Sequence, residues 1–188
     1  PRWGVTVLQA NGEMDAGDIW ASAEFAMRDA TKASLYRNEV TDAAVRAVRQ
    51  AVDSFLDPAF APEPLDYANP EVRGRLRSPV RQEDRAIDWQ HDDTATLLRR
   101  IRSADGFPGV RDQLFGREVF LYDAHPEQRL RGRPGELIAR CGPAVCRATR
   151  DGAVWIGHLR DRQAVHPFKL PATLLLADET RVLPEVVA

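Results

Sequence analysis

Two short segments near the start of the chain alternate between apolar and polar positions. Residues 4–10 place Val5 and Val7 on one side, and residues 19–25 alternate again. Runs of this kind, rich in β-branched residues and bounded by Gly and Asn, predict two strands. The residues between them, 11–18, are rich in Gly, Asn and acidic side chains, so we expect a turn-rich loop that joins the strands.

The period of the apolar residues changes between residues 38 and 56. Apolar side chains recur there at steps of three and four: Val40, Ala44, Val48, Val52 and Phe55. This spacing predicts an amphipathic helix, with Asn38 or Thr41 as its N-cap and Pro58 just beyond its end. Because one apolar stripe is what packing requires, we expect this helix to cover a sheet.

Beyond residue 81 the pattern is one helix followed by short strands. Asp92 or Asp93 can cap a helix in which Leu97 and Ile101 share a face, and Gly106 follows its end. Four apolar runs then predict strands, at residues 118–122, 136–139, 145–149 and 154–158. The Asp151-Gly152 pair between the last two marks a hairpin turn, and the whole pattern favours a small barrel.

A proline-rich stretch separates the two halves. Residues 58–80 contain five prolines and few long apolar side chains, which is typical of a linker. Three arginines alternate on it and are candidate contacts for the phosphates of an anionic substrate: Arg73, Arg75 and Arg77.

Composition and charge exclude several classes of protein. Of the 188 residues, 44% are hydrophobic and 29% charged, which is ordinary for a globular protein. A net charge of −2 gives no overall field to attract nucleic acid or an anionic membrane. No apolar run approaches the roughly 20 residues of a membrane span. Cys141 and Cys146 indicate buried or half-buried strand thiols in a reducing compartment, and we expect a cytoplasmic protein. Neither the cysteines nor the histidines have metal-ligand spacing.

The acidic loop is the strongest candidate for chemistry. Asp15 and Asp18 stand three residues apart, and a carboxylate at the end of a strand can orient a water molecule or move a proton. Gly17 allows the loop to pass close to a flat ligand. Acidic, Gly-containing loops are also common solvated turns, so the spacing alone leaves a plain surface turn open.

The same loop resembles a segment of the formyltransferases that use 10-formyltetrahydrofolate. Gly-Val-Thr-Val at 4–7 and Asp-Ala-Gly-Asp at 15–18 are similar to the strand–acid–loop signature of that family. The first Asp of this signature is catalytic in the family, which implies that role for Asp15. The family's loop lies against the pterin ring, which implies substrate contacts for Ala10, Asn11, Glu13, Met14 and Asp18.

The second half resembles the same family through separate landmarks in family order. They are Asp-Arg-Ala-Ile-Asp-Trp at 84–89, the Ile-Arg…Pro-Gly-Val segment at 101–110, and Arg-Pro-Gly-Glu-Leu at 133–137. The resemblance implies an α+β protein in three parts. Residues 1–57 would be the C-terminal part of an α/β formyltransferase domain, 58–80 a linker, and 81–188 a small OB-like open β-barrel domain.

Within the family, four segments resemble a two-module branch that serves hydrogenase maturation: 7–21, 115–124, 153–159 and 168–172. This branch implies formyl transfer from the cosubstrate 10-formyltetrahydrofolate to coenzyme A, without a metal. An enoyl-CoA hydratase-like domain of the same polypeptide would then release carbon monoxide for a NiFe hydrogenase. Expected partners are these small-molecule substrates and hydrogenase maturation proteins, rather than nucleic acid or a membrane.

Two alternatives stay open. One is a methionyl-tRNA formyltransferase, whose C-terminal domain must bind a polyanion and would be expected to be basic. Residues 81–188 carry 17 basic and 16 acidic side chains, which argues against tRNA as the substrate. The other alternative is a non-catalytic relic or binding module of the same fold. The family also uses an Asn and a His from an upstream segment that does not occur here, and the chain begins with Pro1. We therefore expect a fragment that is inactive by itself.

Overall fold

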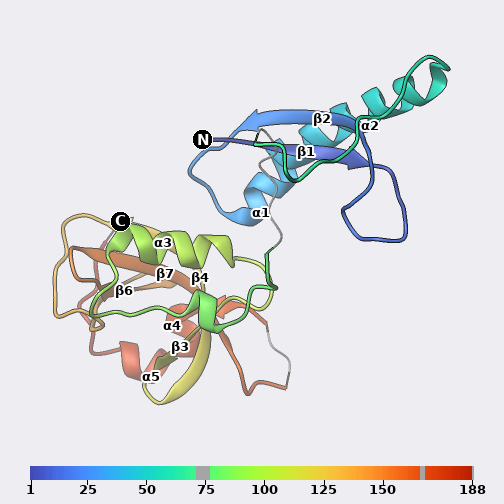
Figure 1. The fold of residues 1–188 in the computed structure, drawn as a ribbon. Coiled ribbons are helices and arrows are strands. Elements are labelled where there is room, and N and C mark those ends of the chain that lie inside the picture. Colours follow the sequence, from blue (N-terminus) through green and yellow to red (C-terminus); the bar gives the residue numbers. More distant parts are fainter. Residues whose placement is uncertain (71–76, 166–167, 188) are drawn as a thin grey trace. The chain divides into compact units, whose positions relative to one another are not determined.

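The computed structural model describes residues 1–70, 77–165 and 168–187 (Figure 1). Contacts divide the chain into two compact units, Pro1–Pro79 and Val80–Ala188. Each unit combines helices with antiparallel strand pairs, so the chain is an α+β protein, as the sequence predicts. Of the three arginines proposed as phosphate contacts, Arg77 is exposed, while Arg73 and Arg75 lie outside the described residues.

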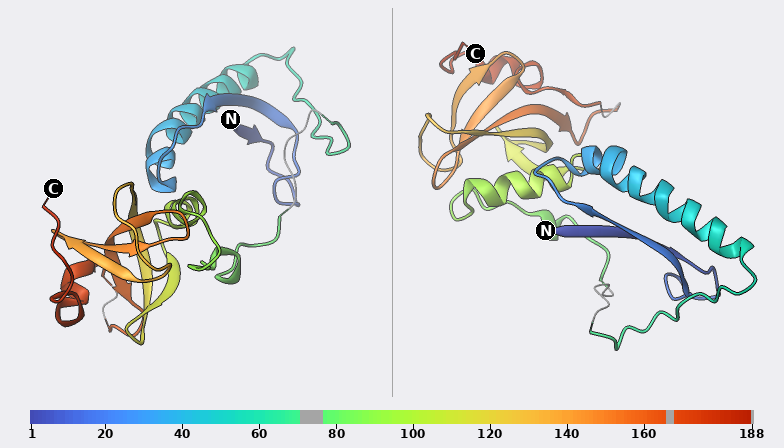
Figure 2. Two further views of the ribbon diagram at one scale, coloured as in Figure 1. Left: turned by 90° about the vertical axis from the view of Figure 1, so that its left-hand side faces the viewer. Right: turned by 90° about the horizontal axis from the view of Figure 1, so that it is seen from above.

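The first unit is a two-stranded ribbon covered by a long helix. β1 (Arg2–Leu8) pairs antiparallel with β2 (Ile19–Ala26), which confirms the two predicted strands. A helical run follows, made of α1 (Lys32–Leu35), the π-helical turn η1 (Tyr36–Val40) and α2 (Thr41–Leu56). Figures 1 and 2 show α2 lying along one face of the ribbon, where it contacts both strands.

The helical run begins earlier than the sequence predicts, so the expected N-caps Asn38 and Thr41 are wrong. Thr31 is the N-cap of α1, and its hydroxyl accepts a hydrogen bond from the Ser34 amide at 3.3 Å. Asn38 and Thr41 lie inside the run, where they donate to the carbonyls of Ser34 and Tyr36 at 2.7 and 2.6 Å. Polar side chains that favour caps can also bond back to helix carbonyls, which explains the error.

The face that α2 buries also differs from the predicted stripe. The residues of α2 that are buried are alanines spaced four apart: Ala43, Ala47 and Ala51. Of the predicted stripe, Val40 and Ala44 are partly buried, but Val48 and Val52 remain 52% and 53% exposed. Small side chains let the helix approach the ribbon closely, so the larger valines are left on its flank.

Residues 58–70 return along the ribbon after α2 ends. The Phe60 ring stacks on Trp20 with 5.6 Å between ring centroids. Glu63 and Ile19 exchange two backbone hydrogen bonds of 2.7 and 3.0 Å, which form an isolated antiparallel bridge. This part of the proline-rich stretch is therefore packed against the start of β2.

The second unit is built on an open antiparallel sheet with the strand order β3-β4-β7-β6-β5, and β8 pairs with β7. The strands are β3 (Val110–Leu114), β4 (Arg117–Glu127), β5 (Leu137–Cys141), β6 (Ala144–Ala148), β7 (Ala153–Asp161) and β8 (Leu170–Pro171). All four predicted strands and the Asp151-Gly152 hairpin turn are confirmed. Within the described residues the sheet does not close into a barrel.

Short helices surround this sheet, and one of them covers its core. They are η2 (Glu83–Arg85), α3 (Thr94–Ser103), α4 (Ala172–Leu175) and α5 (Ala177–Thr180). α3 packs against β4 and β7 (Figure 1). The largest fully buried side chains of this core are Leu97, Ile101, Leu121, Ile156, Leu159 and Leu176. Leu97 and Ile101 are the two residues that the sequence places on one buried face.

The start of α3 is held by two carboxylates. Asp93 is its N-cap and accepts a hydrogen bond from the Thr96 amide at 2.8 Å. Asp151, in the β6–β7 turn, accepts from the amide and hydroxyl of Thr94 at 2.8 and 2.7 Å. The hairpin turn therefore fixes the first turn of a helix that lies more than fifty residues earlier in the chain.

We expect Asp93→Ala to lower the melting temperature of the second unit by about 5 °C, because a capping acceptor is lost. Hydrogen bonds from the Thr96 hydroxyl and amide hold the pKa of Asp93 below its usual value. Its contribution is therefore fully present above the unfolded pKa of about 3.9, and the difference from wild type should shrink as the pH falls below that. Thermal unfolding at pH 7 and pH 2.5 measures both effects. Glu83→Ala, at an exposed position, is the control.

An ion pair is buried inside the second unit. The Asp112 and Arg147 side chains are 13% and 11% exposed and are hydrogen-bonded to each other. The Trp89 indole donates to Asp112 at 3.1 Å, and its ring lies 4.0 Å from the Arg147 guanidinium carbon. Arg147 also donates to the Gly135 carbonyl at 2.7 Å. Burial raises the pKa of Asp112 and lowers the pKa of Arg147 in spite of their mutual attraction.

The last described residues run beside β5. The Arg140 amide donates to the Pro184 carbonyl, and the Val186 amide donates to the Arg140 carbonyl, both at 2.9 Å. This gives a parallel bridge between Arg140 and Glu185, whose side chains also form an ion pair at 2.7 Å. Val186 packs on a small buried cluster that includes Cys146. The edge of β5 is therefore covered by this segment.

Candidate functional site

The acidic loop joins β1 to β2 and is closed at its base by a hydrogen bond from the Gln9 amide to the Asp18 carbonyl, at 2.8 Å. Near its tip, the Asn11 side chain accepts a hydrogen bond from the Glu13 amide at 3.0 Å. Asp15 has a φ of 57°, in the left-handed region that few residues other than Gly adopt. Asp and Asn tolerate this region better than most, but the conformation still needs support from its surroundings.

Gly17 is buried where the two arms of the loop meet. A Cβ atom at this position would lie 1.8 Å from the Gln9 carbonyl oxygen. No side chain fits in that space, so the close approach of the two arms requires glycine. Gly17 therefore fixes the shape of the loop that carries Asp15.

All six residues that the sequence predicts for the site lie on this loop and are exposed: Ala10, Asn11, Glu13, Met14, Asp15 and Asp18. Met14 is 89% exposed at the tip. The loop presents three carboxylates and one large apolar side chain to its surroundings. Such a surface can orient a polar ligand and can give a flat ring an apolar contact.

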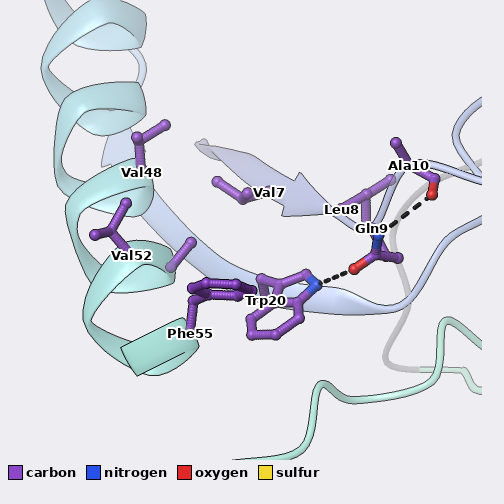
Figure 3. A pocket seen from close by; sticks show the side chains of 9 residues that line it. Val7, Leu8, Gln9, Ala10, Trp20, Val48, Val52 and Phe55 are labelled. Atoms are coloured by element: carbon purple, nitrogen blue, oxygen red, sulfur yellow. Dashed lines mark hydrogen bonds between the residues drawn. The ribbon is translucent and has the colours of Figure 1, made fainter. Parts of the chain in front are cut away.

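An apolar groove of about 290 Å³ adjoins the start of the loop (Figure 3). It is lined by Val7, Leu8, Gln9, Ala10, Trp20, Val48, Ala51, Val52 and Phe55. Of the six predicted site residues, only Ala10 lines it. The groove therefore joins the exposed flank of α2 to the first residues of the loop.

Trp20 is an aromatic residue in the lining of this groove. Its ring centroid lies 5.9 Å from Phe55 and 5.6 Å from Phe60. Its indole nitrogen donates to the Gln9 side chain at 2.9 Å, and Gln9 in turn donates to the Ala10 carbonyl at 3.3 Å, as the dashed lines in Figure 3 show. A hydrogen-bonded chain thus connects the aromatic cluster to the first predicted site residue. Trp20 itself is only partly buried.

Sequence reasoning missed one residue that contacts the predicted site. The Tyr67 hydroxyl donates a hydrogen bond to the carbonyl oxygen of Asp15 at 3.0 Å. Tyr67 lies 52 residues from Asp15, in the proline-rich stretch. No local pattern in the sequence marks such a contact.

The second unit carries a histidine–aspartate cluster on β4 and β7. Asp123 lies 2.9 Å from the His125 ring and 3.1 Å from the His158 ring. Partial burial raises the pKa of Asp123, but the hydrogen bonds from both rings outweigh it and the net shift is downward. Among the described residues, which leave out His166, no group of three or more His, Cys, Asp or Glu is placed to hold a metal ion.

Of the two cysteines, Cys146 offers little reactivity. Cys146 is fully buried, and burial raises its pKa to about 12. A thiol with that pKa carries almost no thiolate at neutral pH, so it is a poor nucleophile. Cys141 is partly exposed and is also a free thiol.

Known proteins resemble the chain over both units. Residues 79–167 match the formyl transferase C-terminal domain. The hydrogenase maturation factor HoxX of Bradyrhizobium diazoefficiens is 53% identical over 183 residues, covering 97% of this chain and 32% of that protein. The crystal structure of HypX from Aquifex aeolicus in complex with tetrahydrofolic acid matches all of this chain and 32% of its own, with a TM-score of 0.90 and 42% identity.

A methionyl-tRNA formyltransferase of Variovorax paradoxus is 27% identical over 159 residues, which cover 84% of this chain and 48% of that enzyme. Residues 79–167 therefore carry the C-terminal domain of the formyl transferases, and the chain as a whole is similar to members of that family, as the acidic loop and the later landmarks indicate. Within that family it is more similar to the hydrogenase maturation factors HoxX and HypX than to this tRNA enzyme, and it spans about a third of their length.

No helix in the described ranges has both the length and the apolar character that crossing a membrane demands.

Proposed function

We propose that these residues are part of an enzyme that transfers the formyl group of 10-formyltetrahydrofolate to coenzyme A during hydrogenase maturation. Residues 1–57 would be the C-terminal part of the formyltransferase catalytic domain. Residues 58–80 would link it to residues 81–188, which would be the C-terminal domain of the formyltransferase. The observation that carries the proposal is the loop on which Asp15 is presented, combined with 53% identity to a HoxX protein. A tetrahydrofolate complex of the related HypX supports folate as the cosubstrate.

The proposed chemistry is an acyl transfer. The coenzyme A sulfur attacks the formyl carbon, a tetrahedral intermediate forms, and the bond from that carbon to the folate nitrogen breaks. The thiol proton ends on that nitrogen, so the products are formyl-coenzyme A and tetrahydrofolate. An Asp15 carboxylate beside the folate can accept and pass on this proton, directly or through an ordered water molecule. Ala10, Asn11, Glu13, Met14 and Asp18 would hold the pterin ring.

The rest of the active site would come from other parts of the polypeptide. The family resemblance implies an Asn and a His that stabilise the oxyanion together with Asp15. It also implies an enoyl-CoA hydratase-like domain, which would split formyl-coenzyme A into coenzyme A and carbon monoxide for a NiFe hydrogenase. Because the chain spans about a third of HoxX and HypX, we expect the 188 residues to be inactive alone.

We expect Asp15→Asn in the complete polypeptide to lower formyl transfer to coenzyme A by about 100-fold, the usual contribution of a proton-transferring side chain. Formyl-coenzyme A and carbon monoxide would be measured from 10-formyltetrahydrofolate, with the isolated 188-residue chain as a second sample. Asp53→Asn, on an exposed part of α2, is the matched control.

Unchanged transfer by Asp15→Asn would remove this residue from the mechanism, and clear turnover by the isolated chain would end the fragment hypothesis. The assay should also offer initiator methionyl-tRNA as acceptor. A preference for tRNA would favour the methionyl-tRNA formyltransferase alternative, which the 27% identity to such an enzyme supports and the nearly balanced charge of residues 81–188 opposes.

A further inference from the structure

Residues 58–70 contact the rest of the first unit at three points, and their partners occur in the reverse order along the chain. Phe60 stacks on Trp20, Glu63 forms a backbone bridge with Ile19, and Tyr67 donates to the Asp15 carbonyl. We call this segment the strap. As the strap runs forward, its partners run backward along the start of β2 and into the acidic loop, so it follows the loop toward its tip.

The Tyr67 hydroxyl donates its hydrogen bond to the backbone of a residue in a strained conformation. Asp15 is left-handed, and its carbonyl oxygen receives the Tyr67 hydroxyl at 3.0 Å. In a residue other than glycine, a left-handed backbone costs free energy, and it persists only where neighbouring groups hold it in place. The direction of the Cα–Cβ bond depends on φ and ψ, so a relaxed backbone would aim the Asp15 carboxylate elsewhere.

Because the loop is exposed, the hydrogen bond from Tyr67 matters for the conformation of the loop. Asp15 and both of its neighbours in sequence on the N-terminal side, Met14 and Glu13, are exposed, so core packing does not fix their conformation. At the base, the loop is closed by Gln9 and Asp18. The Tyr67 hydroxyl supplies a hydrogen bond near the tip from outside the loop itself.

We infer that Tyr67 is a positioning residue for formyl transfer: it holds the Asp15 backbone in the left-handed conformation that aims the carboxylate at the substrate. The inference rests on the proposed function of Asp15. It also gives the proline-rich stretch a role beyond connecting two units, because its first half shapes the site.

The test replaces the hydroxyl alone. In the complete polypeptide, Tyr67→Phe should lower kcat for formyl transfer about fivefold, the effect of one hydrogen bond of ordinary strength. The KM for coenzyme A and the melting temperature should stay as in wild type. Amide hydrogen exchange at residues 14–17 should become faster. Tyr36→Phe is the matched control, because Tyr36 is 55% exposed and Tyr67 is 53% exposed.

The outcomes separate this inference from the proposed function. If Asp15→Asn is inactive and Tyr67→Phe keeps the wild-type kcat, the positioning role is wrong while the proposed function stands. If Asp15→Asn is fully active, Asp15 has no part in the mechanism and the positioning role fails with it, whatever the exchange rates are. If the wild-type polypeptide does not transfer formyl to coenzyme A, the proposed function itself fails. A fall in kcat that comes with a clearly lower melting temperature would also overturn the positioning role, because Tyr67 would then act only on stability.

Discussion

Asp112→Ala and Arg147→Ala are each expected to lower the free energy of unfolding of the second unit by about 3–5 kcal/mol, because each leaves an uncompensated charge in the interior. Both side chains are nearly buried, and both contact Trp89. The raised pKa of Asp112 and the lowered pKa of Arg147 show that burial opposes both charges even when they are paired. Urea unfolding followed by circular dichroism would measure the loss.

A double variant gives the sharper test. Asp112→Leu combined with Arg147→Met removes both charges and keeps much of the volume, so it should lose less stability than either alanine variant. Arg162→Ala is the exposed control. It breaks an ion pair with Glu118 in which the Arg162 side chain is 54% exposed, and it should lower the free energy of unfolding by about 1 kcal/mol or less. If the double variant loses more stability than either alanine variant, the expected dependence of one charge on the other is wrong.

Gly17→Ala is expected to open the acidic loop. The new Cβ would lie 1.8 Å from the Gln9 carbonyl oxygen, a backbone atom that can move only if the two arms of the loop separate. Breaking the hydrogen bond between Gln9 and Asp18 should destabilise the first unit by about 3 kcal/mol. It should also abolish tetrahydrofolate binding by the complete polypeptide, measured by isothermal titration calorimetry, because the loop would no longer hold its shape.

Gly12 provides a matched control in the same loop. A Cβ at Gly12 meets nothing within 4 Å, so Gly12→Ala should leave stability and folate binding close to wild type. Equal folate affinity in Gly17→Ala and Gly12→Ala would show that the shape of the loop does not matter for binding.

The strands that alternate regularly were predictable from the sequence, and the irregular ones were not. β1, β2 and the β6–β7 hairpin follow apolar–polar alternation and turn residues that act locally. β3 was missed because Asp112 breaks its apolar side, and this side chain is nearly buried where it pairs with Arg147, 35 residues away. α4 and α5 have four residues each, too few to show a helical period.

The helix of the first unit shows how a correct period can give the wrong face. Valine at 48 and 52 fits an apolar stripe as well as alanine at 43 and 47 does, and hydrophobicity favours the larger residues. The structure buries the alanines because they allow close contact with the ribbon. Which face of α2 is buried depends on the shape of the ribbon that it packs against, and the sequence of the helix alone does not show that shape.

The sequence was enough to predict that the candidate site lies on one loop, but not how the groups around that loop are arranged. Resemblance to the formyltransferases singled out Asp15 and its neighbours, and all six residues do lie on one exposed loop. The left-handed backbone of Asp15, the space that excludes a side chain at Gly17 and the contact from Tyr67 all depend on groups brought together by folding. Sequence spacing carries no information about such contacts.

The segment at residues 184–186 has a consequence for how the molecule behaves in a concentrated solution. A strand at the end of an open sheet offers free amides and carbonyls, onto which a strand of another molecule can add. Arg140 of β5 instead bonds to Pro184 and Val186 of its own chain. The segment therefore protects the β5 edge of this open sheet against pairing with a strand of another molecule.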